Sequence, residues 1–211
     1  MSPRIGLDLR AILQAATELA DQQGYKEVSL ASLAQKLKVR SPSLYNHVNG
    51  LTGLRRALAL HGLSQLTSDL TSSAVGRSGD EAIRAMSLAY VAYARRHPGL
   101  YEATLQAPAE GDAEHKQASQ VTLGLISRVL DAYQLSDEMK LHAIRSFRSL
   151  LHGFASLEQQ GAFKLPLDLD VTLQVLIDTY LAGIVRLQSM PANTEGTQGE
   201  VLKHAQQPEE D

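Results

Sequence analysis

A cluster of small polar and aromatic side chains at residues 38–47 has the types and spacing that could contact nucleic acid. Its outward-facing members are Ser41, Ser43, Tyr45, Asn46 and His47, with Lys38 and Arg40 at the entrance to the segment. Hydroxyl, phenol, amide and cationic groups hydrogen-bond base edges or bind phosphates. The N-terminus of a helix that begins there adds free backbone N–H groups and the positive end of a dipole, which suit a phosphate.

Two short helices are expected to position this cluster. Ser29 is a suitable N-cap for a helix over residues 29–37. Ser41 followed by Pro42 predicts a second helix that runs through His47. The residues expected to hold both helices against a preceding helix are apolar: Leu33, Ala34, Leu37, Val39 and Leu44. Such a pair is a helix-turn-helix, whose second helix fits the major groove of DNA. The spacing alone is equally consistent with a corner between two helices of an all-α protein.

The hydrophobic periodicity is helical almost throughout, which predicts an all-α fold of about nine helices. Beyond the two short helices, the expected helices cover residues 9–23, 51–70, 80–96, 100–108, 114–133, 136–160 and 170–189. Residues 190–211 are mostly polar and are expected to be a disordered tail.

Charge is distributed unevenly along the 211 residues. Residues 1–62 carry eight Lys and Arg against four Asp and Glu, whereas the remainder carries 12 against 19. A basic head on an acidic body suggests that the head binds an anionic polymer. The first 25 residues lack the apolar core of a secretion signal, and no uncharged stretch is long enough to span a bilayer. We therefore expect a cytoplasmic protein with no membrane partner.

The sequence lacks the motifs that are typical of an enzyme. The chain has no cysteine, which excludes disulfides, thiolate metal sites and a cysteine nucleophile. Its seven histidines are scattered, without an HExxH motif, and neither a glycine-rich phosphate loop nor a nucleophile elbow is present. We expect no catalysis, no metal and no cofactor.

Four segments resemble the TetR family of bacterial transcriptional repressors. They are VSLASLAQKLKV (28–39), SPSLYNHV (41–48), HPGLY (97–101) and RSLLHGFASLEQQGAF (148–163). The last is similar to a subgroup marked by a Trp-His-Gly-type helix, with Leu151, His152 and Gly153 at the matching positions. The resemblance implies a repressor that binds an inverted-repeat operator as a homodimer and is released by a small molecule. The alternative is a helical ligand-binding or scaffold protein with no specific DNA affinity.

The resemblance also implies which residues contact DNA. Ser41, Pro42, Ser43 and Tyr45 match base-contacting positions, while Ser43, Tyr45 and His47 match phosphate contacts. The expected DNA-binding set is Ser29, Lys38, Arg40, Ser41, Pro42, Ser43, Tyr45, Asn46, His47 and Arg55, with Arg4 as a candidate arm.

Three departures from the family pattern bear on DNA binding. Lys38 stands where a glycine is usual, and Ala31 cannot contact a base as the residue there does in some members. Leu51 replaces a lysine that binds phosphate, a role that Arg55 or Arg56 could fill one turn later.

The same resemblance divides the chain into a DNA-binding domain at 1–50 and a ligand-binding and dimerisation domain at 51–189. The helix over 170–189 is apolar almost all round, which suggests burial against both its own subunit and a twin. The expected dimer interface is Leu151, Val175, Tyr180, Leu181 and Ile184. The expected ligand-binding residues are His61, Tyr90, Tyr93, Tyr101, Phe147 and His152, with His97 as a further candidate.

Overall fold

The computed structural model describes residues 7–188, which form eight α-helices, three 3-10 helices and no strand. The elements are α1 (Leu9–Gln23), η1 (Tyr25–Glu27), α2 (Leu30–Leu37), η2 (Ser41–Asn46), α3 (Gly50–Ala74), α4 (Gly79–Arg96), α5 (Pro98–Thr104), α6 (Ala113–Leu130), η3 (Asp131–Tyr133), α7 (Asp137–Gln159) and α8 (Leu169–Leu187). The predicted all-α fold is confirmed. The candidate arm Arg4 and the expected tail at 190–211 lie outside the described residues.

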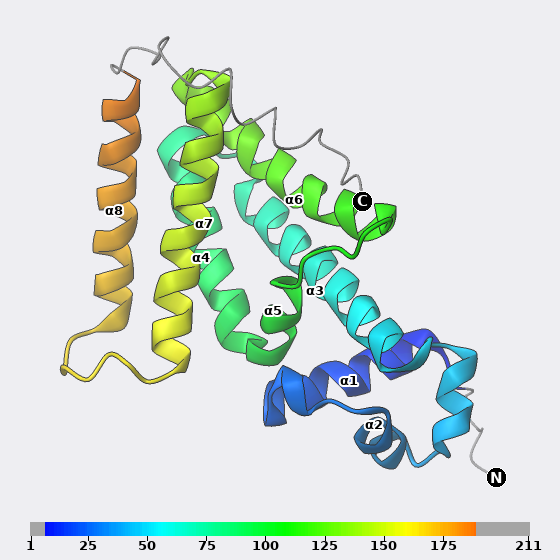
Figure 1. Ribbon diagram of the computed structural model, residues 1–211. Coiled ribbons are helices and arrows are strands. Elements are labelled where there is room, and N and C mark those ends of the chain that lie inside the picture. Colours follow the sequence, from blue (N-terminus) through cyan, green and yellow to red (C-terminus); the bar gives the residue numbers. More distant parts are fainter. Residues whose placement is uncertain (1–6, 189–211) are drawn as a thin grey trace, which may run out of the picture.

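The helices form a small head and a larger body (Figure 1). The head contains α1, α2 and η2, and the long helix α3 leads from it into the body. There α3 packs against α4, α5 and α6, while α7 and α8 lie side by side at the opposite flank. The head and the α7–α8 pair therefore lie at two separate edges of the molecule.

Side-chain caps set the start of several helices. Asp8 accepts a hydrogen bond from the Ala11 amide at 2.7 Å and begins α1. Asp168 caps α8 by accepting hydrogen bonds from the Asp170 and Val171 amides. Asp80 lies in the first turn of α4 and accepts a hydrogen bond from the Tyr133 hydroxyl at 2.6 Å.

The head joins the body through a close contact between α1 and α5. The Asp21 carboxylate accepts hydrogen bonds from the Gly99 and Leu100 amides, each at 3.0 Å. Its second oxygen lies 2.9 Å from Nδ1 of His97. A Cβ added at Gly99 would lie 2.0 Å from the carbonyl oxygen of Ala20, so only glycine lets the two helices approach this closely.

None of the described helices is long and apolar enough to cross a membrane. Within residues 7–188, no group of three or more His, Asp or Glu side chains could hold a metal ion.

We expect Gly99→Ala to lower the free energy of unfolding by at least about 2 kcal/mol, because the new methyl group must push α1 away from α5. Gly124→Ala is the matched control, since the nearest atom to a Cβ there is the end of the flexible Arg128 side chain at 3.8 Å. Alanine should stabilise that helical position by up to about 1 kcal/mol. Urea unfolding followed by circular dichroism measures both changes. A Gly99→Ala protein as stable as the wild type would contradict the close approach of the two helices.

Candidate nucleic-acid interface

Helix α2 begins with a reciprocal cap. The Ser29 hydroxyl accepts from the Ser32 amide at 3.1 Å, and the Ser32 hydroxyl accepts from the Ser29 amide at the same distance. The Ser29 side chain is therefore engaged in starting the helix, and the contribution of Ser29 to DNA binding stays a prediction.

The turn after α2 has the left-handed conformation that usually favours glycine. Lys38 adopts φ 54° and ψ 39°, and its amide donates to the carbonyls of Ala34 and Gln35. A non-glycine residue in this conformation costs about 1 kcal/mol. Lysine thus preserves the turn in place of the usual glycine and adds an exposed cation beside the exposed Arg40.

The segment expected to be the recognition helix is a 3-10 helix, η2, rather than an α-helix. The Ser43 amide donates to the Arg40 carbonyl at 2.9 Å, and the His47 amide donates to the Leu44 carbonyl at 2.9 Å. Pro42 has no amide to donate, and six residues are too few for a long run of α-helical bonds. The tighter winding places side chains three residues apart on one side.

Leu44 anchors η2, since it is completely buried while its neighbours face outward. Tyr45 is 60% exposed and makes no contribution to the core. Pro42, Asn46 and His47 are also exposed, whereas Ser41 and Ser43 are half-buried. The structure thus gathers all six expected η2 and flanking side chains on one short segment of the head.

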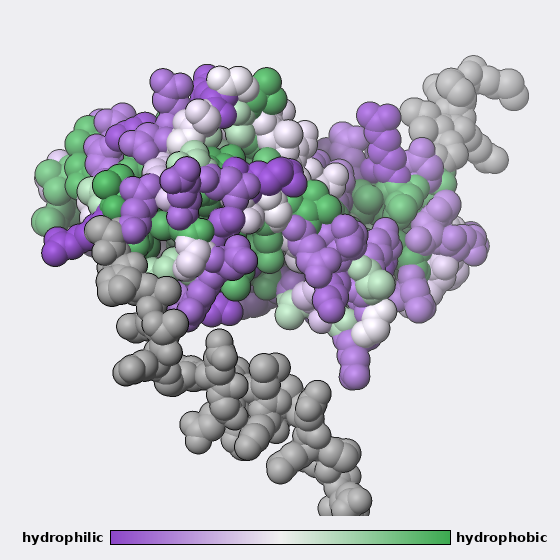
Figure 2. All heavy atoms as spheres, turned by 90° about the horizontal axis from the view of Figure 1, so that it is seen from above, coloured by the Kyte–Doolittle hydropathy of each residue, from purple (hydrophilic) through white to green (hydrophobic). Residues whose placement is uncertain are grey.

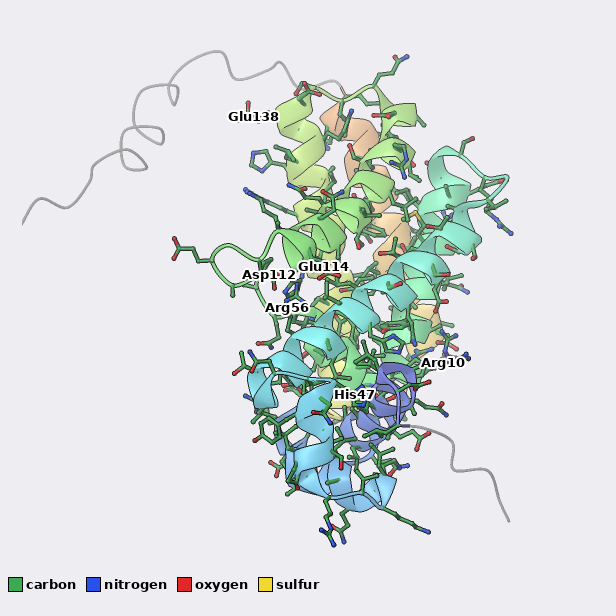
Figure 3. All side chains as sticks on the ribbon, turned by 90° about the vertical axis from the view of Figure 1, so that its right-hand side faces the viewer. Arg10, His47, Arg56, Asp112, Glu114 and Glu138 are labelled. Atoms are coloured by element: carbon green, nitrogen blue, oxygen red, sulfur yellow. The ribbon has the colours of Figure 1, made fainter. Side chains whose placement is uncertain are left out.

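The cations at the start of α3 turn away from this segment. The Arg55 guanidinium lies 5.8 Å from the centre of the Tyr25 ring, and its Nε is buried. Arg56 donates to both oxygens of Asp112, at 2.6 and 2.7 Å, and to Glu114 at 2.8 Å (Figure 3). The Arg56 hydrogen bonds lower the pKa of Asp112 to about 2. In the free protein both arginines therefore already have partners, and the role of Arg55 or Arg56 as a phosphate contact stays a prediction.

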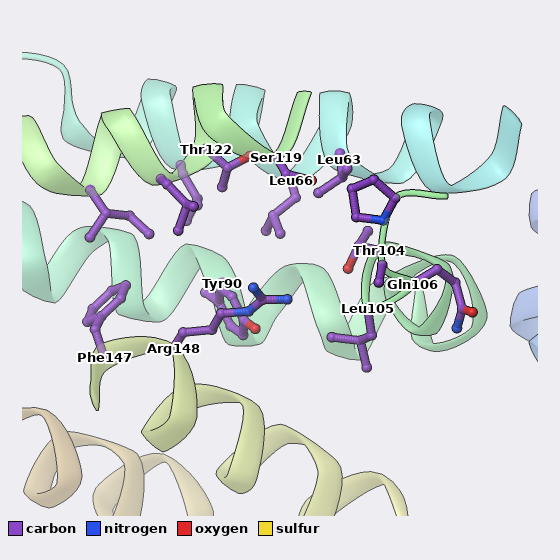
Figure 4. A pocket seen from close by; sticks show the side chains of 15 residues that line it. Leu63, Leu66, Tyr90, Thr104, Leu105, Gln106, Ser119, Thr122, Phe147 and Arg148 are labelled. Atoms are coloured by element: carbon purple, nitrogen blue, oxygen red, sulfur yellow. The ribbon is translucent and has the colours of Figure 1, made fainter. Parts of the chain in front are cut away.

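A cavity of about 310 Å³ lies in the body between α3, α4, α6 and α7 (Figure 4). Of the expected ligand-binding residues, Tyr90 and Phe147 line it. Sequence reasoning missed Arg148 and Gln106, which also line it and bring the cavity a cation and an amide. Arg148 opens the quoted segment at 148–163, but nothing in that pattern indicates that its side chain faces a cavity, and Gln106 lies outside every quoted segment.

The other expected ligand-binding residues lie outside this cavity. The Tyr93 hydroxyl donates to the Gly62 carbonyl at 3.1 Å, and Nε2 of His61 lies 2.8 Å from the Gln65 amide nitrogen. His97 contacts Asp21 at the head.

Tyr101 and His152 lie behind the Tyr90 wall of the cavity. The Tyr101 hydroxyl is 2.9 Å from that of Tyr90 and 2.7 Å from Nδ1 of His152. Burial raises the pKa of both tyrosines, so both phenols remain protonated and available as hydrogen-bond donors.

Four of the five residues expected at a dimer interface are buried within their own subunit. Leu181 is only 4% exposed, and Leu151, Tyr180 and Ile184 are similarly enclosed. The Tyr180 hydroxyl also donates to the Ala143 carbonyl at 2.9 Å. Val175 differs, with 59% of its surface exposed. Most of the predicted set therefore lies on faces of α7 and α8 that pack within the same subunit, and the dimer interface itself stays a prediction.

Comparisons with known proteins match both parts of the chain. The family model described as "Bacterial regulatory proteins, tetR family" matches residues 12–49, and the model "Tetracyclin repressor-like, C-terminal domain" matches residues 83–180. The chain is 41% identical over 186 residues to the uncharacterized HTH-type transcriptional regulator YobS of Bacillus subtilis, covering 88% of this chain and 96% of that protein. It is 33% identical over 181 residues to the uncharacterized HTH-type transcriptional regulator Rv0681 of Mycobacterium tuberculosis, covering 85% and 83%.

Solved structures share the fold. A protein of unknown function from Rhodococcus sp. RHA1 has a TM-score of 0.73 and 22% identity, covering 87% of this chain and 98% of that one. TetR from Acinetobacter baumannii AYE has a TM-score of 0.64 and 23% identity, covering 87% and 100%.

We expect Tyr45→Ala to weaken specific DNA binding by about 1–3 kcal/mol for each interaction with a base that it removes, because the exposed ring and phenol would no longer reach the groove. The free energy of unfolding should change by less than about 1 kcal/mol, since the Tyr45 side chain is mostly exposed. Fluorescence anisotropy on a duplex selected by the wild-type protein measures the affinity. Tyr45→Phe separates the phenol from the ring, and undiminished affinity in Tyr45→Ala would remove Tyr45 from the interface.

Proposed function

Because this chain belongs to the TetR family of transcriptional regulators, we propose that it is a repressor that binds an inverted-repeat operator as a homodimer and is released by a small molecule. Regulators of this family are non-enzymatic DNA-binding proteins, so the expectation of no catalysis is confirmed. The observation that carries the proposal is η2, whose polar side chains face outward around the buried anchor Leu44. A DNA partner implies that the protein acts in the cytoplasm.

The proposed domains follow the same division, with DNA binding in residues 1–50 and ligand binding and dimerisation in 51–189. A single η2 contacts few base pairs, so useful specificity requires two heads related by a two-fold axis.

The exposed apolar side chains of the α7–α8 flank support a dimer there. The most exposed ones on these helices and their connection are Leu141, Leu157, Leu165, Leu167, Val171, Val175 and Val185. Figure 2 shows hydrophobic side chains along the flank that α8 forms. A Cβ added at Gly153 or Gly183 would meet no atom within 4 Å, so these positions leave room for a second pair of helices. The interface that we propose therefore consists of Val175 and the other exposed apolar side chains of this flank, and it omits the four residues that are buried within the subunit.

The cavity of the body supports release by a mostly apolar small molecule. Leucines form much of its wall, and Tyr90, Gln106 and Arg148 supply a few polar groups that could orient a ligand. Thr104 and Leu105, at the end of α5, line the same cavity. A ligand could bind more tightly when α5 takes a different position. Because Asp21 of the head is hydrogen-bonded to the start of α5, the head would move with it. The population would then shift away from the DNA-binding form.

Selection of bound duplexes from a random DNA pool, at physiological salt, tests the proposed function. An enriched inverted repeat is the expected result, and Tyr45→Ala is the control that should enrich that repeat less strongly. Affinity for the selected site should also fall steeply with salt, because phosphate contacts release counterions. If a refolded, dimeric sample enriches no sequence, the chain is instead a helical ligand-binding or scaffold protein.

We expect Val175→Glu to convert the dimer into a folded monomer, because a carboxylate would be buried between two copies of α8. Val121→Glu on α6 is the matched control, since that valine is 47% exposed on another helix and its variant should remain dimeric. Sedimentation velocity measures the mass, and circular dichroism verifies the fold. A Val175→Glu dimer would place the interface elsewhere.

A further inference from the structure

The cavity of the body carries a single charge. Among the described residues that line it, Arg148 is the only charged one. This residue is exposed rather than enclosed by protein, so a ligand in the cavity can reach its guanidinium. Within residues 7–188 no carboxylate forms an ion pair with Arg148. An uncompensated cation in a largely apolar wall favours a ligand with one negative charge.

Arg148 extends from α7 toward Tyr90 on α4. Figure 4 shows its guanidinium beside the Tyr90 side chain, in the space that the lining side chains surround. Burial raises the pKa of the Tyr90 phenol, while the hydrogen bond with Tyr101 and the charge of Arg148 act in the opposite direction. The phenol therefore stays protonated at physiological pH, and the cation and the phenol together form the polar site of the cavity.

The threonine hydroxyls of the cavity wall already have partners. The Thr104 hydroxyl donates to the Tyr101 carbonyl at 2.7 Å, and the Thr122 hydroxyl lies 2.6 Å from that of Thr67. Neither group carries a charge. The choice between a charged and a neutral ligand therefore falls on Arg148 and Tyr90.

The donor that Tyr90 presents depends on a chain of hydrogen bonds. Its hydroxyl lies 2.9 Å from that of Tyr101, which in turn lies 2.7 Å from Nδ1 of His152. When Nδ1 carries a proton it donates to Tyr101, so Tyr101 donates to Tyr90 and the Tyr90 proton is left for a group in the cavity. When Nδ1 carries none, Tyr101 donates to it, Tyr90 donates to Tyr101, and no proton is left. An anion beside Tyr90 therefore favours the form of His152 with a proton on Nδ1.

The apolar part of the cavity suits an unbranched chain. Leu63, Leu66 and Leu70 line it along one face of α3, and Leu123 and Ile126 line it along α6. From Leu63 to Leu70 this face of α3 is about 10 Å long. An extended chain of roughly eight carbons has a similar length. The volume of about 310 Å³ is about twice that of a cavity that accepts benzene, which leaves enough room for such a chain.

We propose that the cavity of the body binds a monocarboxylic acid with an unbranched chain of roughly eight carbons. The carboxylate would accept two parallel hydrogen bonds from the Arg148 guanidinium, the forked geometry in which arginine binds carboxylates, and a third from the Tyr90 hydroxyl. The chain would lie between the apolar faces of α3 and α6. This inference rests on the proposed function, because it names the chemical class of the small molecule that releases the DNA.

Octanoate is the probe, and calorimetry on the full chain without DNA measures its binding after refolding has removed any copurified acid. We expect saturable binding that Arg148→Gln weakens at least about tenfold, because the charge and the fork are lost. Arg145→Gln is the matched control: this arginine is exposed on the same helix but does not line the cavity, and its variant should bind octanoate as the wild type does. Octanol has the same chain without the charge and should bind at least about tenfold more weakly.

Chain length and His152 give two further readouts. Butanoate should bind at least about tenfold more weakly than octanoate, because each buried methylene contributes about fourfold to the affinity. A nitrogen spectrum of the imidazoles follows Nδ1 of His152, whose resonance is assigned by its loss in His152→Phe. Octanoate should shift this resonance toward that of a protonated nitrogen.

The proposal is overturned if octanoate shows no saturable binding, if octanol or the Arg148→Gln protein gives the affinity of octanoate for the wild type, or if binding leaves the Nδ1 resonance unmoved. Because Arg148 is exposed, Arg148→Gln should fold, and thermal melting verifies this. Failure of the proposed function has a different signature. Octanoate would then bind through Arg148, yet the selected duplex, followed by fluorescence anisotropy, would stay bound to the saturated protein.

Discussion

The contact of α1 with α5 fixes the head on the body, and the functional parts depend on it. Asp21 binds the two free amides at the start of α5, and Gly99 lets the Ala20 backbone lie directly against that helix. A close backbone contact has few alternative positions, because neither helix has a flexible side chain there to absorb a shift. Movement of α5 is therefore passed to α1 and, through the head core, to η2.

Helix α5 also contacts the two other regions that the proposed function requires. Tyr101, on the same short helix as Gly99, has its hydroxyl within hydrogen-bond distance of Tyr90 in the cavity wall and of His152 on α7. The cavity of the body and α7, which lies next to the proposed dimer face, thus meet on a seven-residue helix. Coupling between two sites needs an element that both sites can displace. Helix α5 is such an element, because it contacts the head and the wall of the body cavity directly.

Hydrophobic periodicity predicted the helices well, because each buries one apolar stripe, but it could not assign faces or long-range contacts. A helix that is apolar all round gives no sign of which side packs within its own subunit, so the expected interface combined the buried Leu181 with the exposed Val175. The 3-10 winding of η2 depends on the missing amide of Pro42 and on its short length. The pairing of Asp21 with His97 joins residues 76 positions apart, and no local pattern indicates it.

The ion pairs of the head leave few cations free, which would limit non-specific binding to DNA relative to sequence-specific binding. Lys26, Lys36 and Arg56 each pair with a carboxylate of the chain, at distances from 2.6 to 3.9 Å. The exposed cations near η2 are then chiefly Lys38 and Arg40. Each phosphate neutralised adds a slope of about −0.9 to the salt dependence of binding, so few free cations give weak non-specific binding. Under the proposed function, discrimination between DNA sites would then come mainly from the hydroxyl, phenol and amide groups of η2.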